Sequence, residues 1–90
     1  MLKETYHPNA YLTNLRNVRL GLRARTNILN ALETGASNAK KIVDKTGMHY
    51  GVVMHHLKLL RSEDIVRRER GKPSVWGLTG VGQKRLINAG

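Results

Sequence analysis

The sequence predicts a mainly helical α+β domain with three helices, a two-stranded β-hairpin and a short C-terminal helix, in that order. Apolar residues recur at helical spacing between residues 19 and 62. Between residues 65 and 78 the apolar period changes to two, as in the strands of a hairpin. Glycines and a proline separate these segments, and a chain of 90 residues has room for one such domain.

The first predicted helix covers residues 19–34 and ends at Gly35. Its apolar stripe has spacings of three and four and consists of Leu22, the aliphatic stem of Arg25, Ile28, Leu29 and Leu32. The residues before this helix show no clean period, and Pro8 interrupts them. We therefore expect residues 1–18 to form an N-terminal arm or accessory segment and residues 19–90 to form the folded domain.

Two further helices are predicted in close succession. The second has Ser37 as its expected N-cap and stops at Gly47, which suits the left-handed position of a C-terminal cap. The third covers about residues 49–62, and its buried face is expected to hold Val53, His56, Leu57 and Leu60. A short helix, a glycine-containing turn and a second amphipathic helix make a helix-turn-helix.

The predicted hairpin has strands over residues 65–70 and 74–78. Gly71 is expected to supply a positive φ in the turn, and Pro73 to hold Lys72 extended. After the hairpin, Thr79 suits the N-cap of the last helix, whose apolar residues are Val81, Leu86 and Ile87.

The charge balance indicates an anionic partner. Sixteen Lys and Arg residues against six Asp and Glu give a formal net charge of +10. A small domain with this charge gains free energy on a polyanion because each neutralised phosphate releases counterions. Nucleic acid is the favoured partner, and an anionic membrane surface or a merely soluble basic protein are the alternatives.

Other classes of protein are disfavoured by composition. Cysteine is absent, which excludes disulfides, thiolate chemistry and Cys-based zinc sites. No apolar run reaches the roughly 20 residues that a membrane span needs. The first four residues lack the apolar stretch of a secretory signal. We therefore expect a cytoplasmic, nucleoid-associated protein without a membrane partner and without a cofactor.

The ordered set of motifs resembles the winged helix-turn-helix regulators, in particular ArsR-like repressors and related archaeal and MarR-type domains. The resemblance covers roughly residues 20–87. It is carried by Thr46-Gly47-Met48-His49-Tyr50-Gly51-Val52-Val53-Met54-His55-His56-Leu57-Lys58-Leu59-Leu60, by Ile65-Val66-Arg67-Arg68, by Val75-Trp76-Gly77-Leu78-Thr79 and by Gly82. Three positions depart from the family pattern. His49 replaces the usual capping serine, Gly51 and Val52 replace polar residues, and Asp64 replaces a frequent glycine.

The resemblance implies that the third helix reads double-stranded DNA in the major groove. The residues expected on that surface are His49, Tyr50, Gly51, Met54, His55, Lys58 and Arg61. The hairpin would be the wing, on the backbone or minor groove, through Arg67, Arg68, Arg70, Lys72 and Ser74. The start of the second helix would contact phosphates through Ser37, Asn38, Lys40 and Lys41.

Several of these residues also have plainer interpretations. A metal site at His49, His55 and His56 is disfavoured because neighbouring helical residues point apart and no paired carboxylate lies at ligand spacing. His56 is expected to be a hydrogen-bonded core residue. Trp76 is expected to pack beneath the hairpin. The proline followed closely by tryptophan is also similar to winged helices that bind left-handed DNA, but their Asn and Tyr pair is missing from the third helix.

The favoured function is a sequence-specific transcriptional regulator. The family pattern implies a homodimer, whose pairing surface would come from residues 1–20 and the last helix. The alternatives are an architectural, chromatin-like DNA binder and, less favoured, a winged helix for protein contacts. No nucleophile, base and orienting group occur together, so an enzyme is not expected, and no small-molecule effector is evident. The operator sequence and the choice between activation and repression stay open.

Overall fold

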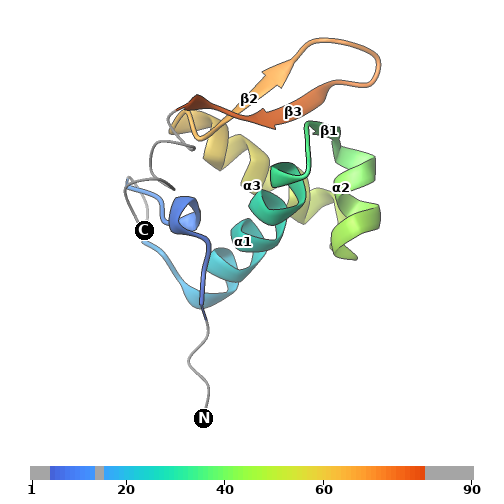
Figure 1. The fold of residues 1–90 in the computed structure, drawn as a ribbon. Coiled ribbons are helices and arrows are strands. Elements are labelled where there is room, and N and C mark those ends of the chain that lie inside the picture. Colours follow the sequence, from blue (N-terminus) through green and yellow to red (C-terminus); the bar gives the residue numbers. More distant parts are fainter. Residues whose placement is uncertain (1–4, 14–15, 81–90) are drawn as a thin grey trace.

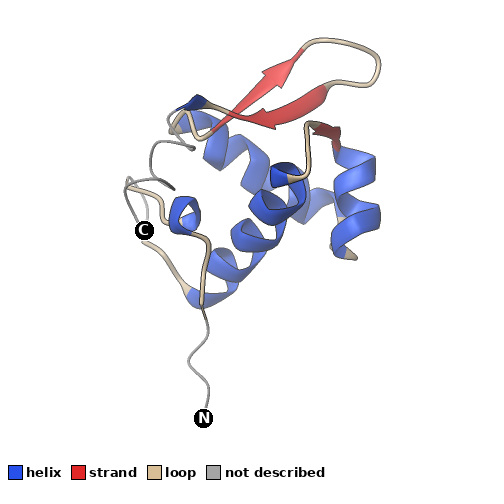
Figure 2. Ribbon diagram, in the orientation of Figure 1, coloured by secondary structure: helices blue, strands red, loops and turns tan. Residues whose placement is uncertain are grey.

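The computed structural model describes residues 5–13 and 16–80 as helices packed beneath a small antiparallel sheet (Figures 1 and 2). Its elements are η1 (Pro8–Ala10), α1 (Arg19–Glu33), β1 (Ser37–Asn38), α2 (Ala39–Thr46), α3 (Tyr50–Ser62), β2 (Val66–Glu69) and β3 (Val75–Leu78). The three long helices and the hairpin lie within a residue or two of their predicted bounds. The predicted last helix, with Val81, Gly82, Leu86 and Ile87, lies outside the described residues.

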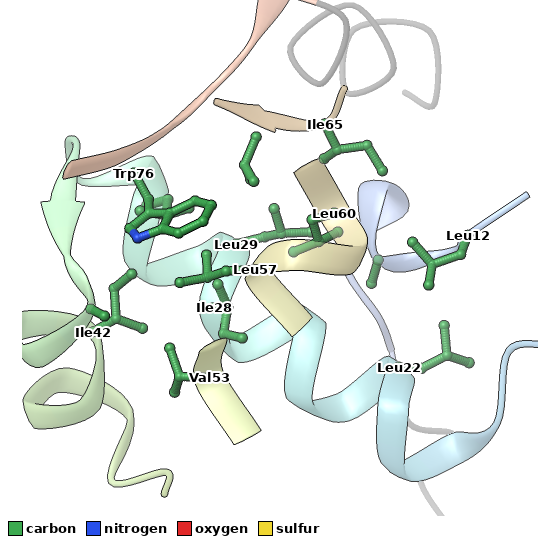
Figure 3. Close-up of a cluster of buried hydrophobic side chains, with 14 residues drawn as sticks. Leu12, Leu22, Ile28, Leu29, Ile42, Val53, Leu57, Leu60, Ile65 and Trp76 are labelled. Atoms are coloured by element: carbon green, nitrogen blue, oxygen red, sulfur yellow. The ribbon is translucent and has the colours of Figure 1, made fainter. Parts of the chain in front are cut away.

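One apolar core joins the three α-helices to the sheet (Figure 3). Ile28 of α1, Ile42 of α2 and Leu57 of α3 point into it and have no exposed surface. Trp76 of β3 covers this core from the side of the sheet and is only 2% exposed. Burying each such side chain contributes about 1.5–3 kcal/mol of transfer free energy. The packing of Trp76 beneath the hairpin and the predicted helical stripes are therefore confirmed, except that His56 of α3 is only half-buried.

The sheet has three strands where two were predicted. Its order is β1-β3-β2, and both neighbouring pairs are antiparallel. The extra strand is the two-residue β1, in which Ser37 pairs with Trp76 and Asn38 with Val75. A strand of this length leaves no alternating pattern in the sequence, so periodicity could not reveal it.

The predicted N-cap of α2 is wrong by one residue. Ser37 belongs to β1 and is buried, and its hydroxyl donates to the carbonyl of Gly35 at 3.4 Å. Asn38 is the N-cap, because its Oδ1 accepts a hydrogen bond of 2.8 Å from the Lys41 N–H. Pairing with β3 holds Ser37 in extended backbone and leaves the next side chain to face the open helix end.

Three turns show how backbone conformation ends the elements. Gly47 follows α2 with φ +71°, which confirms the predicted left-handed C-cap. Gly71 was expected to have a positive φ, but the described glycines with positive φ are Gly35 and Gly47. The hairpin turn instead contains a cis Lys72–Pro73 peptide bond. Asp64, where the family often has glycine, has φ +60°.

Asp64 completes a Schellman motif at the end of α3. Its N–H donates to the Arg61 carbonyl at 3.0 Å, and the Ile65 N–H donates to the Leu60 carbonyl at 3.0 Å. Leu60 and Ile65 are both fully buried, which supplies the apolar contact of that motif. The sharp turn at Asp64 thereby directs the chain from α3 into the hairpin.

The N-terminal segment packs against α1 and α3. Ala10 and Leu12 are buried in the core, and the Thr13 N–H donates to the Glu63 carboxylate at 2.8 Å. Arg25 of α1 is 3% exposed, so its guanidinium is buried along with the aliphatic stem on which the sequence analysis relied. Its Nε donates to the Ala10 carbonyl at 2.6 Å.

Candidate nucleic-acid interface

The exposed face of α3 begins at a histidine cap. The Nδ1 atom of His49 accepts a hydrogen bond of 3.1 Å from the Gly51 N–H, so the histidine takes the place of the usual serine. Tyr50 follows and is 56% exposed. Gly51, His55, Lys58 and Arg61 are also exposed. The predicted polar face of the helix therefore lies at the surface.

A cavity of about 240 Å³ lies where α2, α3 and the hairpin meet. It is lined by Asn38, Ala39, Lys40, Tyr50, Met54, Arg68, Pro73, Ser74 and Trp76. Six of these nine residues were predicted to contact DNA, and they come from three segments that are far apart in the sequence. Met54 is half-buried and also packs on the core, which separates it from the fully exposed residues of the helix.

The two neighbouring arginines of β2 differ in their surroundings. Arg68 pairs directly with Trp76 across the β2–β3 ladder, and its guanidinium carbon lies 5.7 Å from the ring centroid. Its Nη2 donates to the Ser74 hydroxyl at 3.0 Å. Arg67 is one residue earlier and therefore on the other face of the sheet. It forms a 3.0 Å ion pair with Glu69 on that face.

The remaining wing residues lie at the hairpin tip. Arg70 and Lys72 are exposed, and Ser74 is half-buried beside Arg68. The structure thus brings Arg68 and Ser74 to the cavity, together with Lys40 and Asn38 from the start of α2. Lys41 is exposed but does not line the cavity. Ser37 is the predicted contact residue that the structure buries.

His56 is half-buried on the side of α3 that contacts Arg25 of α1. Its Nδ1 accepts a hydrogen bond of 3.4 Å from Arg25, and its ring meets that of His55 edge-on with centroids 5.0 Å apart. Burial, reinforced by the positive charge of Arg25 and by His55, lowers the pKa of His56 to about 4. The ring is therefore neutral at pH 7 and hydrogen-bonded as predicted, but it is half-buried and does not belong to the core. Within residues 5–13 and 16–80 no three His, Asp or Glu side chains form a metal-ligand group.

Two features of this surface were not predicted from the sequence. One is the stacking of Arg68 on Trp76, which a correct cross-strand register would have revealed because directly opposed residues share a face. The other is the cavity, which depends on how the helices pack and has no signal in the sequence.

Among the helices that the structure describes, none is long and apolar enough to cross a membrane.

Comparison with known proteins yields one family match. The model of the bacterial regulatory proteins of the arsR family matches residues 23–68. That range contains most of α1, all of β1, α2 and α3, and most of β2. Among curated protein sequences, none matches the chain.

Solved structures share the same architecture. The Zα domain of PKZ from Carassius auratus, solved in complex with Z-DNA, is 29% identical, with a TM-score of 0.60 over 63% of this chain and 94% of its own. A homodimeric winged helix-turn-helix DNA-binding domain from Mycobacterium bovis, a possible ArsR-family transcriptional regulator, is 27% identical with a TM-score of 0.66. That match covers 78% of this chain and 66% of its own.

A third structure supports the fold alone. BpsR of Bordetella bronchiseptica, whose DNA binding is regulated by 6-hydroxynicotinic acid, is 20% identical with a TM-score of 0.66. The match covers 72% of this chain and 49% of BpsR, so the chain spans about half the length of that regulator.

Proposed function

Because the chain belongs to the ArsR family of bacterial regulatory proteins, we propose that it regulates transcription by sequence-specific binding to double-stranded DNA. In this proposal α3 enters the major groove, and the hairpin lies on the adjacent backbone or minor groove. The observation that carries it is the convergence of the start of α2, the start of α3 and the hairpin around one cavity. The formal net charge of +10 supplies the electrostatic attraction.

Different residues would have different roles on the DNA. Tyr50, Met54 and His55 are proposed to contact base edges, with Gly51 allowing close approach of the backbone. The residues proposed for phosphates are Lys58 and Arg61 of α3, Asn38, Lys40 and Lys41 at α2, and Arg68, Arg70, Lys72 and Ser74 of the hairpin. Ser37 is left out because it is buried, and Arg67 is directed away from the cavity.

We further propose that the protein acts as a homodimer on the nucleoid. A two-fold pair of winged helices places two recognition helices in successive major grooves, which doubles the contact to one operator. The M. bovis domain is a homodimer of this fold, which supports the proposal. Sedimentation of the protein alone and with its DNA site measures the state directly, and a monomer in both would contradict it.

Selection of bound sequences from random duplexes tests the proposed function. A regulator should enrich one site, preferred over other sequences by on the order of a thousandfold at near-physiological salt. A flat profile with strong binding would instead support an architectural DNA binder. If no duplex bound even at low salt, the fold would serve protein contacts and the DNA proposal would be wrong.

A left-handed duplex is the second candidate ligand. The similarity to the Z-DNA-bound PKZ domain, and the hairpin sequence with Pro73 and Trp76, favour including it. The Asn and Tyr pair of such domains is missing from α3, which is why the right-handed duplex is preferred here. Circular dichroism of an alternating CG duplex shows whether the protein inverts its spectrum. An unchanged spectrum in a verified complex would dismiss this candidate.

A further inference from the structure

We propose that the cavity between α2, α3 and the hairpin seats one sugar–phosphate unit of a DNA strand, and that Arg68 is the residue that fixes its phosphate. The inference rests on the proposed function, because it assumes that this face meets DNA. It adds a specific ligand group and a positioning residue to that face. It also separates Arg68 from the neighbouring Arg67, which the sequence alone gave no reason to do.

Arg68 is held in place before any ligand arrives. Its cross-strand partner is Trp76, and its guanidinium carbon lies 5.7 Å from the ring centroid, within the range of cation–π attraction. Ser74 accepts a hydrogen bond of 3.0 Å from its Nη2. An exposed arginine normally loses much rotamer freedom on binding, and these two contacts lower that cost. Arg68 also keeps further N–H donors, because a guanidinium has five.

The cavity wall combines positive charge with apolar surface. Lys40 brings a second cation from the first turn of α2, where the helix dipole also favours an anion. Tyr50, Met54 and Pro73 add apolar surface beside these charges. A volume of about 240 Å³ corresponds to roughly eight water molecules at liquid density. Cations next to an apolar wall in this space suit a phosphate with its attached deoxyribose.

Arg67 provides a matched control one residue away. It lies on the opposite face of the sheet and next to Gly77, where a Cβ would come within 3.7 Å of its Nη2. Its charge is already paired with Glu69 at 3.0 Å. Arg68→Ala and Arg67→Ala therefore remove the same charge from the same strand. Only Arg68→Ala removes a group from the cavity.

The experiment combines these variants with DNA in which one phosphate at a time is a neutral methylphosphonate. The duplex is the site obtained by selection, and anisotropy of the labelled duplex gives Kd. For the wild-type protein and Arg67→Ala, we expect one methylphosphonate position in each half-site to weaken binding roughly tenfold, because a charge-assisted hydrogen bond is lost. For Arg68→Ala, a methylphosphonate at that position should change Kd less than twofold, because the arginine that binds this phosphate is already missing.

Three further measurements test the same phosphate site. Arg68→Ala should lower the slope of log K against log salt by ~0.9, the value for one phosphate contact. Ser74→Ala keeps every charge but releases Arg68, and should weaken binding at that position by less than Arg68→Ala does. Trp76 is the only tryptophan of the chain and lines the cavity, so its fluorescence should change when the duplex saturates the protein.

The outcomes separate the seat from the proposed function. If methylphosphonates weaken the binding of Arg68→Ala as much as that of the wild-type protein at every position, the proposed phosphate site is wrong but DNA binding is not. The same holds if Arg67→Ala, instead of Arg68→Ala, loses the effect at one position. Unchanged Trp76 fluorescence in a complex verified by anisotropy would also overturn the seat. If the wild-type protein binds no duplex, the proposed function itself fails. Circular dichroism of each variant confirms that the fold is kept.

Discussion

At the scale of single residues, His56 couples the stability of the fold to pH. Its pKa is lowered to about 4 by burial, by Arg25 and by His55, whereas an unfolded histidine titrates near 6.5. The unfolded chain therefore binds more protons than the folded one between these values. Stability from the neutral ring is complete above pH 6.5 and is lost as the pH falls toward 4.

Replacing His56 should flatten that dependence. The side chain is only partly buried, so solvent screening reduces the expected loss to on the order of 1–2 kcal/mol across the window. His56→Gln keeps an acceptor for Arg25 but does not titrate, and its free energy of unfolding should vary less between pH 6.5 and pH 4. Urea denaturation at a series of pH values measures both proteins. Parallel curves for the two would show that His56 does not carry the effect.

Asp64 is a second residue whose conformation predicts a stability change. A non-glycine residue at φ +60° is strained, although Asp tolerates this region better than most. Asp64→Gly should therefore raise the free energy of unfolding by up to about 1 kcal/mol. Asp64→Ala should lower it, because alanine gains no relief in the left-handed region. Thermal unfolding of the wild-type protein and the two variants gives their order of stability. If Asp64→Ala were more stable than Asp64→Gly, backbone strain at residue 64 would be contradicted.

At the scale of elements, the prediction and the structure assign the N-cap of α2 to different residues. The sequence favoured Ser37 as N-cap, and the structure gives that role to Asn38. Asn38→Ala should cost about 1 kcal/mol of stability because the Lys41 N–H loses its acceptor. Ser37→Ala should cost less than half as much, since its hydroxyl makes only a long 3.4 Å bond. Urea denaturation midpoints measure the stability of both variants. A larger loss of stability for Ser37→Ala than for Asn38→Ala would support Ser37 as the N-cap.

A comparison of the long helices with β1 shows which elements apolar periodicity can predict. Long amphipathic helices such as α1 and α3 repeat one pattern over several turns, so their existence and buried faces were predictable from apolar spacing. β1 is two residues long and exists because β3 offers a free edge, which is a tertiary cause. The candidate site divides in the same way. Its helical residues follow from the amphipathic pattern, whereas the seat around Arg68 depends on strand register and helix packing.

At the scale of the whole molecule, the N-terminal segment closes the core on the side of α1 that faces away from α2 (Figure 1). The His7 ring donates to the Glu33 carboxylate at 2.7 Å, and its backbone N–H donates to the Thr26 hydroxyl at 2.9 Å. Asn17 bonds both backbone groups of Leu12, at 2.7 and 2.8 Å. These contacts hold residues 5–13 against α1. From the sequence, residues 1–18 were expected to form an arm or accessory segment, because their apolar residues have no regular period.

Leu12 tests whether that segment contributes to global stability. Its side chain is 5% exposed and belongs to the same core as Leu22 of α1. Truncation to alanine should therefore cost about 2–3 kcal/mol, from lost transfer free energy and from the space left behind. Tyr11→Ala is the matched control, because Tyr11 is adjacent but 45% exposed, and it should cost under 1 kcal/mol. Urea unfolding followed by far-UV circular dichroism reports on the helices as a whole. An independent arm would leave that transition unchanged in both variants, whereas a segment integrated into the core should shift it for Leu12→Ala alone.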